Sequence, residues 1–408
     1  MRVGIIGGGP AGYSAALLGA KKGWDVTLFE RKDIGGTCLN RGCIPTKSLI
    51  NSALHGLSFE EAKKRKELAK RRLVLGVERL LQKAGVKVIG KEARLEERKI
   101  ITDDEVYEFD RILVATGSVP SFPPIEGKEN AKTSEDALEL HTLPERVIII
   151  GGGVIGLEFA FVLSSFGSEV HVVEIMEEVL PGTDPECASV VRRELEKKGI
   201  RFYLRKRVER IEEKKIYGEV ELEGDAVFLF TGRKPCLENL PPEIRDENGV
   251  KVDEYLETPI PGVFAAGDCT GQFMLAHYAY HQAEVAVENM EEKRVRCRRN
   301  AVPGTVFTHP EYAWAGEMEG ESVKVPFSAN GRAIAEGDTA GFVKLFYKEG
   351  RVTGIHIVGG RASELIFSAT FMLGRKLEEL RWSIPPHPTN SELLKEAVLA
   401  ALGTSIHC

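Results

Sequence analysis

The fold is decided by a short stretch at the start of the chain, RVGIIGGGPAG, at residues 2–12. Its apolar part (2–6) predicts a buried strand, and the glycine turn that follows opens an apolar helix to about Lys22. A second strand, at 25–29, ends at Glu30. The same order returns at 147–156, where VIIIGGGVIG leads into a helix and then a strand that ends at Glu174. In each copy the first glycine precedes the acid by 23 positions, from 7 to 30 and from 151 to 174.

A glycine turn alone is often nothing more than a tight turn. Here each turn stands between a strand and a helix, and a carboxylate closes the next strand, which is the context that a dinucleotide-binding fold requires. Free N–H groups at the helix start hold phosphates, and the acid accepts hydrogen bonds from a ribose diol. Two such units predict two bound dinucleotides. In the second unit, Glu174 would repel a 2′-phosphate and residues 175–178 supply no arginine to bind one, so NAD(H) is favoured over NADP(H).

Length and composition limit the class of protein. The 408 residues predict two to three domains. With 61 acids against 55 bases the net charge is only −6, which does not suggest binding to nucleic acid or an anionic membrane through bulk charge. No apolar run approaches the ~18 residues of a membrane helix, and the immediate start of the glycine turn leaves no room for a signal peptide. Seven cysteines do not form the even set of a secreted disulfide framework, so we expect a cytoplasmic protein.

Several further segments predict strands and helices. Two apolar runs, 111–117 and 226–232, end in Thr-Gly, and each is either a crossover between domains or an ordinary strand before a glycine turn. A third strand at 262–268 precedes a helix from about Leu275. The last hundred residues alternate strands (342–347, 352–358) with helices (361–373, 391–402) and predict a separate α+β domain.

The segment 60–83 is rich in lysine and arginine, with leucines at helical spacing. It can be interpreted as a basic patch. Because glutamates are interleaved with the bases, a solvated helix face is the favoured interpretation.

The most informative chemistry lies in GGTCLNRGCIPTK, at 35–47. A pair of cysteines four residues apart can be half of a zinc site or a coincidence, but no second Cys or His pair with ligand spacing follows, so no metal site is predicted. Pro45 suits the first turn of a helix, which places Cys43 near a positive dipole end that lowers a thiol pKa. Lys47 adds a cation one turn later.

With these residues, the sequence resembles the flavin-dependent pyridine nucleotide–disulfide oxidoreductases over essentially its whole length, and most closely the members that oxidise dihydrolipoamide. The segment 35–47 is close to that family's redox-disulfide signature. The other matching segments are ATGS (115–118), AAGD (265–268) and MLAH (274–277) for FAD contacts, THPEYAWAGE (308–317) and VPFSANGRA (325–333) for the interface domain, HPTNSE (387–392) for the catalytic His–Glu segment, and the SIHC ending.

The resemblance implies an α/β protein with two Rossmann-like domains and a C-terminal α+β dimerisation domain. We expect the FAD-binding domain at 1–117 with 240–300, the NAD-binding domain at 118–239 and the interface domain at 301–408. The implied activity is oxidation of the dihydrolipoyl group of a lipoyl-carrier protein, or of a 2-oxo acid dehydrogenase or glycine cleavage complex, with NAD+ as acceptor. The implied assembly is a homodimer.

The resemblance also implies residue roles. Cys43 is the thiol nearest the flavin, and Cys38 exchanges with substrate. In this family the histidine at position 387 reaches the disulfide of the other subunit. The implied catalytic set is Cys38, Cys43, Lys47, Glu158, His387 and Glu392. The implied FAD-binding residues are Gly7, Gly9, Pro10, Ala11, Gly12, Glu30, Thr37, Lys47, Thr116, Gly117, Ser118, Asp268, Met274, Leu275, Ala276 and His277, and those for NAD are Gly151, Gly153, Val154, Ile155, Gly156, Glu158, Glu174, Val208 and Gly232.

Alternatives stay open at this point. A histidine before a proline is usually a loop residue, and only Glu392, five positions on, suggests that His387 is a base. Val154 and Glu174 disfavour a glutathione reductase, the absence of a terminal cysteine pair disfavours a mercuric reductase, and the intact pair disfavours a single-cysteine NADH oxidase. A non-catalytic flavoprotein regulator has no need of both the cysteines and the His–Glu set. Pro385-Pro386 departs from the His-Ala usual before the catalytic histidine and weakens the lipoyl assignment.

Overall fold

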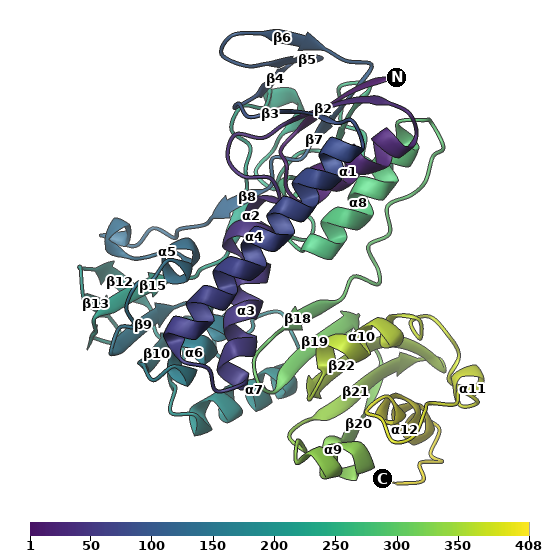
Figure 1. Ribbon diagram of the computed structural model, residues 1–408. Coiled ribbons are helices and arrows are strands. Elements are labelled where there is room, and N and C mark those ends of the chain that lie inside the picture. Colours follow the sequence, from purple (N-terminus) through teal and green to yellow (C-terminus); the bar gives the residue numbers. More distant parts are fainter. Residues whose placement is uncertain (408) are drawn as a thin grey trace. The chain divides into compact units, whose positions relative to one another are not determined.

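The computed structural model describes residues 1–407 and divides into two compact units (Figure 1). The first unit comprises Met1–Ser52, Leu57–Ser121 and Gly232–Arg298. The second comprises Ala53–Gly56, Phe122–Thr231 and the described chain from Arg299 onward. Within residues 1–407, no helix is both long enough and apolar enough to cross a membrane.

A parallel sheet forms the centre of the first unit, with the strand order β17-β7-β1-β2-β3. Its strands are β1 (Arg2–Ile6), β2 (Asp25–Phe29), β3 (Lys87–Ile89), β7 (Arg111–Val114) and β17 (Val263–Ala265). The central strands are buried, which explains their unbroken apolar runs in the sequence. α1 (Pro10–Lys21) follows β1 and packs against α8 (Ala276–Asn289) (Figure 1).

The remaining elements of the first unit include the helices of the cysteine segment. These helices are α2 (Gly36–Arg41), α3 (Cys43–Leu54) and α4 (Phe59–Lys83), and the smaller elements are β4 (Arg94–Glu96), β5 (Lys99–Ile101), β6 (Val106–Glu108), β8 (Ser118–Pro120), β16 (Arg233–Pro235), η2 (Pro242–Ile244) and η3 (Asp268–Thr270). α4 begins at a capping box, in which Ser58 Oγ accepts from Glu61 N and the Glu61 carboxylate accepts from Ser58 N. Such a cap stabilises a helix by about 1 kcal/mol.

A second parallel sheet, ordered β11-β10-β9-β15, repeats the design of the first. Its strands are β9 (Arg146–Ile150), β10 (Glu169–Val173), β11 (Arg201–Tyr203) and β15 (Ala226–Leu229). The helical elements of this part are η1 (Lys128–Asn130), α5 (Ser134–Leu138), α6 (Val154–Ser165) and α7 (Pro185–Lys197). A small antiparallel sheet is formed by β12 (Val208–Ile211), β13 (Lys215–Gly218) and β14 (Leu222–Glu223). Val3 pairs with Val26 in the first sheet, and Val147 pairs with Val170 in the second. The two sheets therefore share the same register.

The C-terminal part of the second unit is an antiparallel sheet covered by helices, with the strand order β18-β19-β22-β21-β20. Its elements are β18 (Gly304–Val306), β19 (Glu311–Gly316), β20 (Glu321–Pro326), η4 (Phe327–Ala329), α9 (Gly331–Glu336), β21 (Phe342–Lys348), β22 (Arg351–Gly359), α10 (Ala362–Thr370), α11 (Leu377–Leu380) and α12 (Glu392–Ala401). α10 packs on β19 and α12 on β20, and the side chains between them form one apolar core.

The predicted fold class is confirmed, with two Rossmann-like parts and a C-terminal α+β part. The predicted three-domain boundaries stay a prediction. Within the second unit, the Nζ of Lys344 on β21 lies 2.7 Å from Asp184 Oδ2, at the start of α7. The hydroxyl group of Tyr312 on β19 forms a hydrogen bond of 2.7 Å with His356 Nδ1, and it also accepts a hydrogen bond from Asp184 N. This polar cluster joins α7 to the C-terminal sheet.

Candidate active site

The first glycine turn is built so that only glycine fits. Gly7 has φ +106°, and a Cβ there would lie 2.2 Å from the carbonyl oxygen of Ala115. A Cβ on Gly12 would lie 1.8 Å from the carbonyl oxygen of Gly7. The turn therefore brings the start of α1 close to the carboxyl end of β1. Gly9, at the N-cap of α1, offers no side-chain cap, so the N–H groups of the first helical turn are available to an anion.

The second turn has the same construction. Gly151 has φ +110°, and a Cβ on Gly156 would lie 2.0 Å from the carbonyl oxygen of Gly151. Gly153 is the N-cap of α6, again without a side-chain cap. Val154 and Ile155 are the first two residues of that helix. The repeat found in the sequence is thus a repeat of backbone geometry.

The two predicted ribose-binding acids are held identically. Glu30 Oε2 accepts from Gly8 N at 2.7 Å, and its Oε1 accepts from Lys32 N at 2.8 Å. Glu174 Oε2 accepts from Gly152 N at 2.6 Å, and its Oε1 accepts from Met176 N at 2.8 Å. Each carboxylate is therefore fixed beside its glycine turn, at the carboxyl edge of the sheet, where this fold class binds its ligands.

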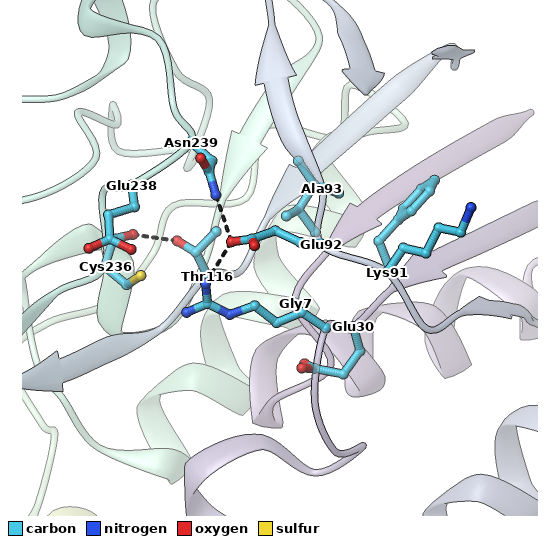
Figure 2. Close-up of a pocket in the computed structure, with 12 residues that line it drawn as sticks. Gly7, Glu30, Lys91, Glu92, Ala93, Thr116, Cys236, Glu238 and Asn239 are labelled. Atoms are coloured by element: carbon cyan, nitrogen blue, oxygen red, sulfur yellow. Dashed lines mark hydrogen bonds and ion pairs between the residues drawn. The ribbon is translucent and has the colours of Figure 1, made fainter. Parts of the chain in front are cut away.

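An open pocket of about 80 Å³ lies beside the first turn, with Gly7 and Glu30 in its wall (Figure 2). Glu92 Oε1 accepts from Asn239 Nδ2 at 2.8 Å and forms an ion pair with Arg31 at 2.7 Å. Thr116 Oγ1 donates to the carbonyl oxygen of Cys236 at 2.7 Å. The Glu30 carboxylate beside the Gly7 turn places this pocket where the adenosine end of a dinucleotide would bind. The sequence did not single out Arg31, Glu92 or Asn239, because they come from three separate segments.

A second polar group of the first unit surrounds Asp268, the first residue of η3. Ser118 Oγ donates to Asp268 Oδ2 at 2.6 Å, and Arg233 Nε donates to Ser118 Oγ at 2.8 Å. Burial raises the pKa of Asp268, while the Ser118 hydrogen bond and the Arg233 charge oppose that rise. Ser118 and Asp268 were predicted from the sequence. Arg233 was not, although it directly follows the Thr-Gly of the second crossover.

The cysteine pair spans two helices. Cys38 lies within α2, and Cys43 is the first residue of α3. Neither cysteine is in a disulfide bond in this structure. A hydrogen bond to Cys43 and burial raise the pKa of the Cys38 thiol, whereas Cys43 is exposed. Burial and this hydrogen bond oppose a charge on Cys38, whereas Cys43 lies at the first residue of α3, where the helix dipole favours negative charge. Lys47 lies one turn further along α3.

The start of α2 is pressed against the first glycine turn. A Cβ on Gly36 would lie 2.7 Å from the Cα of Gly9. Asn40 Nδ2 donates to the carbonyl oxygens of Ile34 and Gly36, both at 3.0 Å, and fixes the segment before Cys43. The predicted phosphate-binding turn and the predicted redox pair are therefore neighbours. Thr37 lies in α2, and of the other predicted FAD contacts Ala276 and His277 open α8.

A tyrosine pair that the sequence reasoning missed lies near the thiols. Tyr13 on α1 and Tyr280 on α8 have hydroxyl oxygens 2.6 Å apart. Burial raises the pKa of Tyr280, and its hydrogen bond with Tyr13 and the charges of Cys38 and Cys43 raise it further. Tyr13 directly follows the glycine turn, which was the one sequence signal available for it.

The predicted NAD site lies mainly in the second unit. Glu158 is buried on α6, and its Oε1 accepts from Phe307 N at 3.1 Å. The resemblance implies that Glu158 pairs with Lys47, and this pairing stays a prediction. Val208 lies on β12, with its side chain in the apolar core. Gly232 begins the last segment of the first unit.

The predicted base and its carboxylate are brought together. His387 Nδ1 lies 3.0 Å from Glu392 Oε2, and Glu392 Oε1 accepts from Thr389 N at 2.7 Å. Although partial burial opposes it, these hydrogen bonds hold the pKa of Glu392 below its usual value. His387 itself is 79% exposed, so its ring faces outward from the unit that holds it.

A similar pair lies one turn along α12. Glu396 accepts from Ser405 Oγ and lies 2.8 Å from His407 Nδ1. This carboxylate ties the end of the described chain to the helix that carries Glu392. His407 belongs to the SIHC ending noted in the sequence, whereas Glu396 carries no sequence signal of this contact. Cys408 lies outside the described residues.

Comparisons with known proteins agree with this geometry. Residues 1–283 match the family described as pyridine nucleotide-disulphide oxidoreductase, and residues 302–398 match its dimerisation domain. A dihydrolipoyl dehydrogenase of Bacillus subtilis is 33% identical over 100% of both chains, and dihydrolipoyl dehydrogenase 2 of Haloarcula marismortui is 35% identical over 99% of this chain and 97% of that protein.

Solved structures are similar as well. The HOCl-induced flavoprotein disulfide reductase RclA from Escherichia coli superposes with a TM-score of 0.91 at 28% identity, covering 98% of this chain and 99% of that one. LpdA from Mycobacterium tuberculosis gives 0.89 at 27% identity, with 98% and 99% covered.

Proposed function

Because this chain belongs to the pyridine nucleotide-disulphide oxidoreductase family, we propose that it oxidises protein-bound dihydrolipoyl groups to the cyclic disulfide with NAD+ as acceptor. It is an FAD-dependent disulfide oxidoreductase that resembles dihydrolipoyl dehydrogenases along its whole length, and FAD and NAD are its cofactors. The observation that carries the proposal is the cysteine pair, in which Cys38 is hydrogen bonded to Cys43 at the first residue of α3.

The residues present fit both cofactors. Each glycine turn leaves backbone space that a Cβ would fill, and each sheet edge presents a fixed carboxylate, Glu30 or Glu174. We assign the first set to FAD, with Asp268 toward its ribitol chain, and the second set to NAD. FAD, when bound, supplies the two-electron chemistry that connects the cysteine pair to the nicotinamide.

The protein's own residues carry out the disulfide exchange. One thiolate of the dihydrolipoyl group attacks Cys38 in the oxidised pair, and the bond between the two cysteine sulfurs breaks, leaving Cys43 as the thiolate. The second substrate thiolate attacks the substrate sulfur of the mixed disulfide and releases Cys38 as a thiolate, which takes up a proton that His387 removed from the substrate. The substrate thus gains its cyclic disulfide, and its two electrons remain on the cysteine pair.

His387 is the base that we assign to the substrate thiols. Glu392 orients the ring through Nδ1, which leaves Nε2 to accept a proton. The dimerisation domain indicates a homodimer. The exposure of His387 supports the proposal that it completes the cysteine site of the other subunit.

The finer partners belong to the proposal. We infer that the substrate group is presented by a lipoyl-bearing protein of a multienzyme complex, and that the reaction takes place in the cytoplasm, where a dithiol cycle is sustained. The alternative substrate is another disulfide, which the departure at Pro385-Pro386 and the similarity to a HOCl-induced flavoprotein disulfide reductase favour.

The deciding experiment is NADH formation from dihydrolipoamide and NAD+ by the purified holoenzyme, with NADP+ as the parallel acceptor. We expect turnover with NAD+ and little with NADP+, because Glu174 opposes a 2′-phosphate. If NADH reduces the flavin rapidly but dihydrolipoamide gives no turnover, the family assignment stands and the substrate assignment is wrong.

A further inference from the structure

α4 carries the strongest concentration of one charge in the chain. Residues 63–72, KKRKELAKRR, contain seven bases and one acid, whereas the whole protein has a net charge of −6. α4 is a single helix from Phe59 to Lys83, so these bases lie along two to three turns. Such a density of like charge repels itself and lowers the stability of an isolated helix. A function that uses the charge would explain its presence.

The outward face of α4 combines this charge with apolar side chains. Its residues are Lys64, Leu68, Arg71, Arg72, Leu75 and Arg79, which follow one another at helical spacing; we call this set the basic face. Leu68 is 69% exposed and Leu75 is 38% exposed. Arg71, Arg72 and Arg79 are exposed and form no ion pair within residues 1–407, in contrast to Lys63 and Lys66, which pair with Glu60 and Glu67. The sequence favoured a merely solvated face, which does not account for exposed leucines among unneutralised arginines.

The opposite side of α4 packs against the cysteine segment. α4 contacts α2, the helix that carries Cys38, and it contacts α1, which begins at the first glycine turn (Figure 1). A protein bound to the basic face is therefore held by the helix that packs against the helix carrying Cys38.

We propose that the basic face of α4 is the docking surface for an acidic protein domain that carries the dihydrolipoyl group. The inference rests on the proposed function, because it names the partner that delivers the substrate. Arginines steer an oppositely charged domain to the enzyme and raise its rate of encounter. Leu68 and Leu75 supply the apolar contact that the carrier domain needs at the centre of the interface.

Two other occupants are less well supported. A second copy of this chain has its own apolar surface in the dimerisation part, where Phe367, Phe371, Trp382 and Ile384 are each at least 66% exposed. Nucleic acid is disfavoured as the occupant because the net charge of the protein outside residues 63–72 is strongly negative. Exposed leucines also favour a protein partner over phosphate groups.

The test compares a purified acidic lipoyl domain, lipoylated and reduced, with free dihydrolipoamide as substrates of the holoenzyme. The variant is Arg71→Glu with Arg72→Glu. The matched control is Arg193→Glu with Lys197→Glu, two exposed bases on α7 that undergo the same change of charge. Arg71→Lys with Arg72→Lys preserves the charge and serves as the conservative variant.

We expect the Glu variant to lower kcat/KM for the lipoyl domain about tenfold at low ionic strength, with less effect as salt rises. The control, the Lys variant and every rate with free dihydrolipoamide should stay unchanged. Equal losses in the control, or a loss with free dihydrolipoamide, would overturn the proposal. Dissociation of the dimer of the Glu variant in sedimentation would also overturn it, because the face would then belong to an interface with a second copy. Oligonucleotide binding by the wild type that the Glu variant loses would overturn it as well.

The proposed function and the docking surface fail separately. If the wild-type enzyme does not oxidise free dihydrolipoamide, the substrate assignment is wrong. Direct binding of the lipoyl domain, measured by calorimetry on wild-type and Arg71→Glu/Arg72→Glu enzymes, still decides whether the basic face holds it. Equal affinity for the two enzymes would refute the docking surface.

Discussion

The two cysteines of the proposed redox pair differ in burial and electrostatic environment because they lie at different positions in two helices. Cys38 is largely enclosed in α2, and a hydrogen bond and burial raise its pKa. Cys43 is exposed at the first residue of α3, where the helix dipole favours a thiolate. The two cysteines therefore lie in different electrostatic environments, as the proposed exchange thiol and the proposed charged thiol require.

We expect Cys38→Ser and Cys43→Ser each to abolish oxidation of dihydrolipoamide and to leave NADH-to-dye transfer intact. Disulfide exchange needs both sulfur atoms, whereas transfer between nicotinamide and flavin needs neither. Steady-state assays with the two electron donors measure both reactions on one preparation. Residual oxidation of dihydrolipoamide by the Cys43→Ser enzyme would refute the scheme.

The two strand–turn–helix elements offer a matched pair of substitutions. A Cβ on Gly12 meets the carbonyl oxygen of Gly7 at 1.8 Å, and one on Gly156 meets that of Gly151 at 2.0 Å. Backbone atoms do not move aside as a flexible side chain does, so alanine must separate each helix from its turn.

We expect the Gly12→Ala enzyme to purify with little flavin. The Gly156→Ala enzyme should keep its flavin, but NADH should reduce that flavin at least about tenfold more slowly, since a misplaced binding group lowers a reaction rate by that factor or more. Flavin absorbance per chain and the rate of flavin bleaching by NADH measure the two effects. Loss of flavin from both variants to the same extent would contradict the assignment of one cofactor to each turn.

At the scale of the whole molecule, the assembly of the site across the dimer can be tested by mixing subunits. If His387 serves the partner's cysteines, a dimer of one Cys38→Ser subunit and one His387→Ala subunit contains one complete site. We expect such co-expressed heterodimers to oxidise dihydrolipoamide, while both parent homodimers do not. Inactive heterodimers that still transfer electrons from NADH to dye would place His387 in its own subunit's site.

The polar cluster that joins α7 to the C-terminal sheet makes stability depend on pH. Burial lowers the pKa of His356 from 6.5 to about 4, with Asp184 opposing and Lys344 reinforcing the shift. Between these two values the unfolded chain binds more protons than the folded one, so the free energy of unfolding falls as pH falls, by about 3 kcal/mol in all. Urea unfolding at pH 7 and pH 4.5 should show a smaller loss for His356→Gln than for wild type. Equal losses would show that His356 does not contribute.

Much of the site follows from local sequence. The glycine turns, their acids and the start of α3 at Cys43 depend on backbone geometry that neighbouring residues impose. His387 and Glu392 are only five positions apart, so their contact is also a local event. The strands and helices of the two parallel sheets can be predicted from local sequence for the same reason, since long apolar runs bounded by glycine turns are compatible with few other structures.

By itself, then, the sequence determined the repeated dinucleotide-binding unit, the position of the proposed redox pair and the class of chemistry, because each of these lies in a continuous segment. Only the tertiary structure decided which distant side chains meet: Arg31 with Glu92 and Asn239, Arg233 with Ser118, Tyr13 with Tyr280, and Lys344 with Asp184. These contacts join residues from segments far apart in the chain, and their partners are set by sheet order and helix packing rather than by spacing. The exposure of the arginines and leucines on α4 is likewise a property of packing, since it depends on which face of the helix the rest of the unit covers.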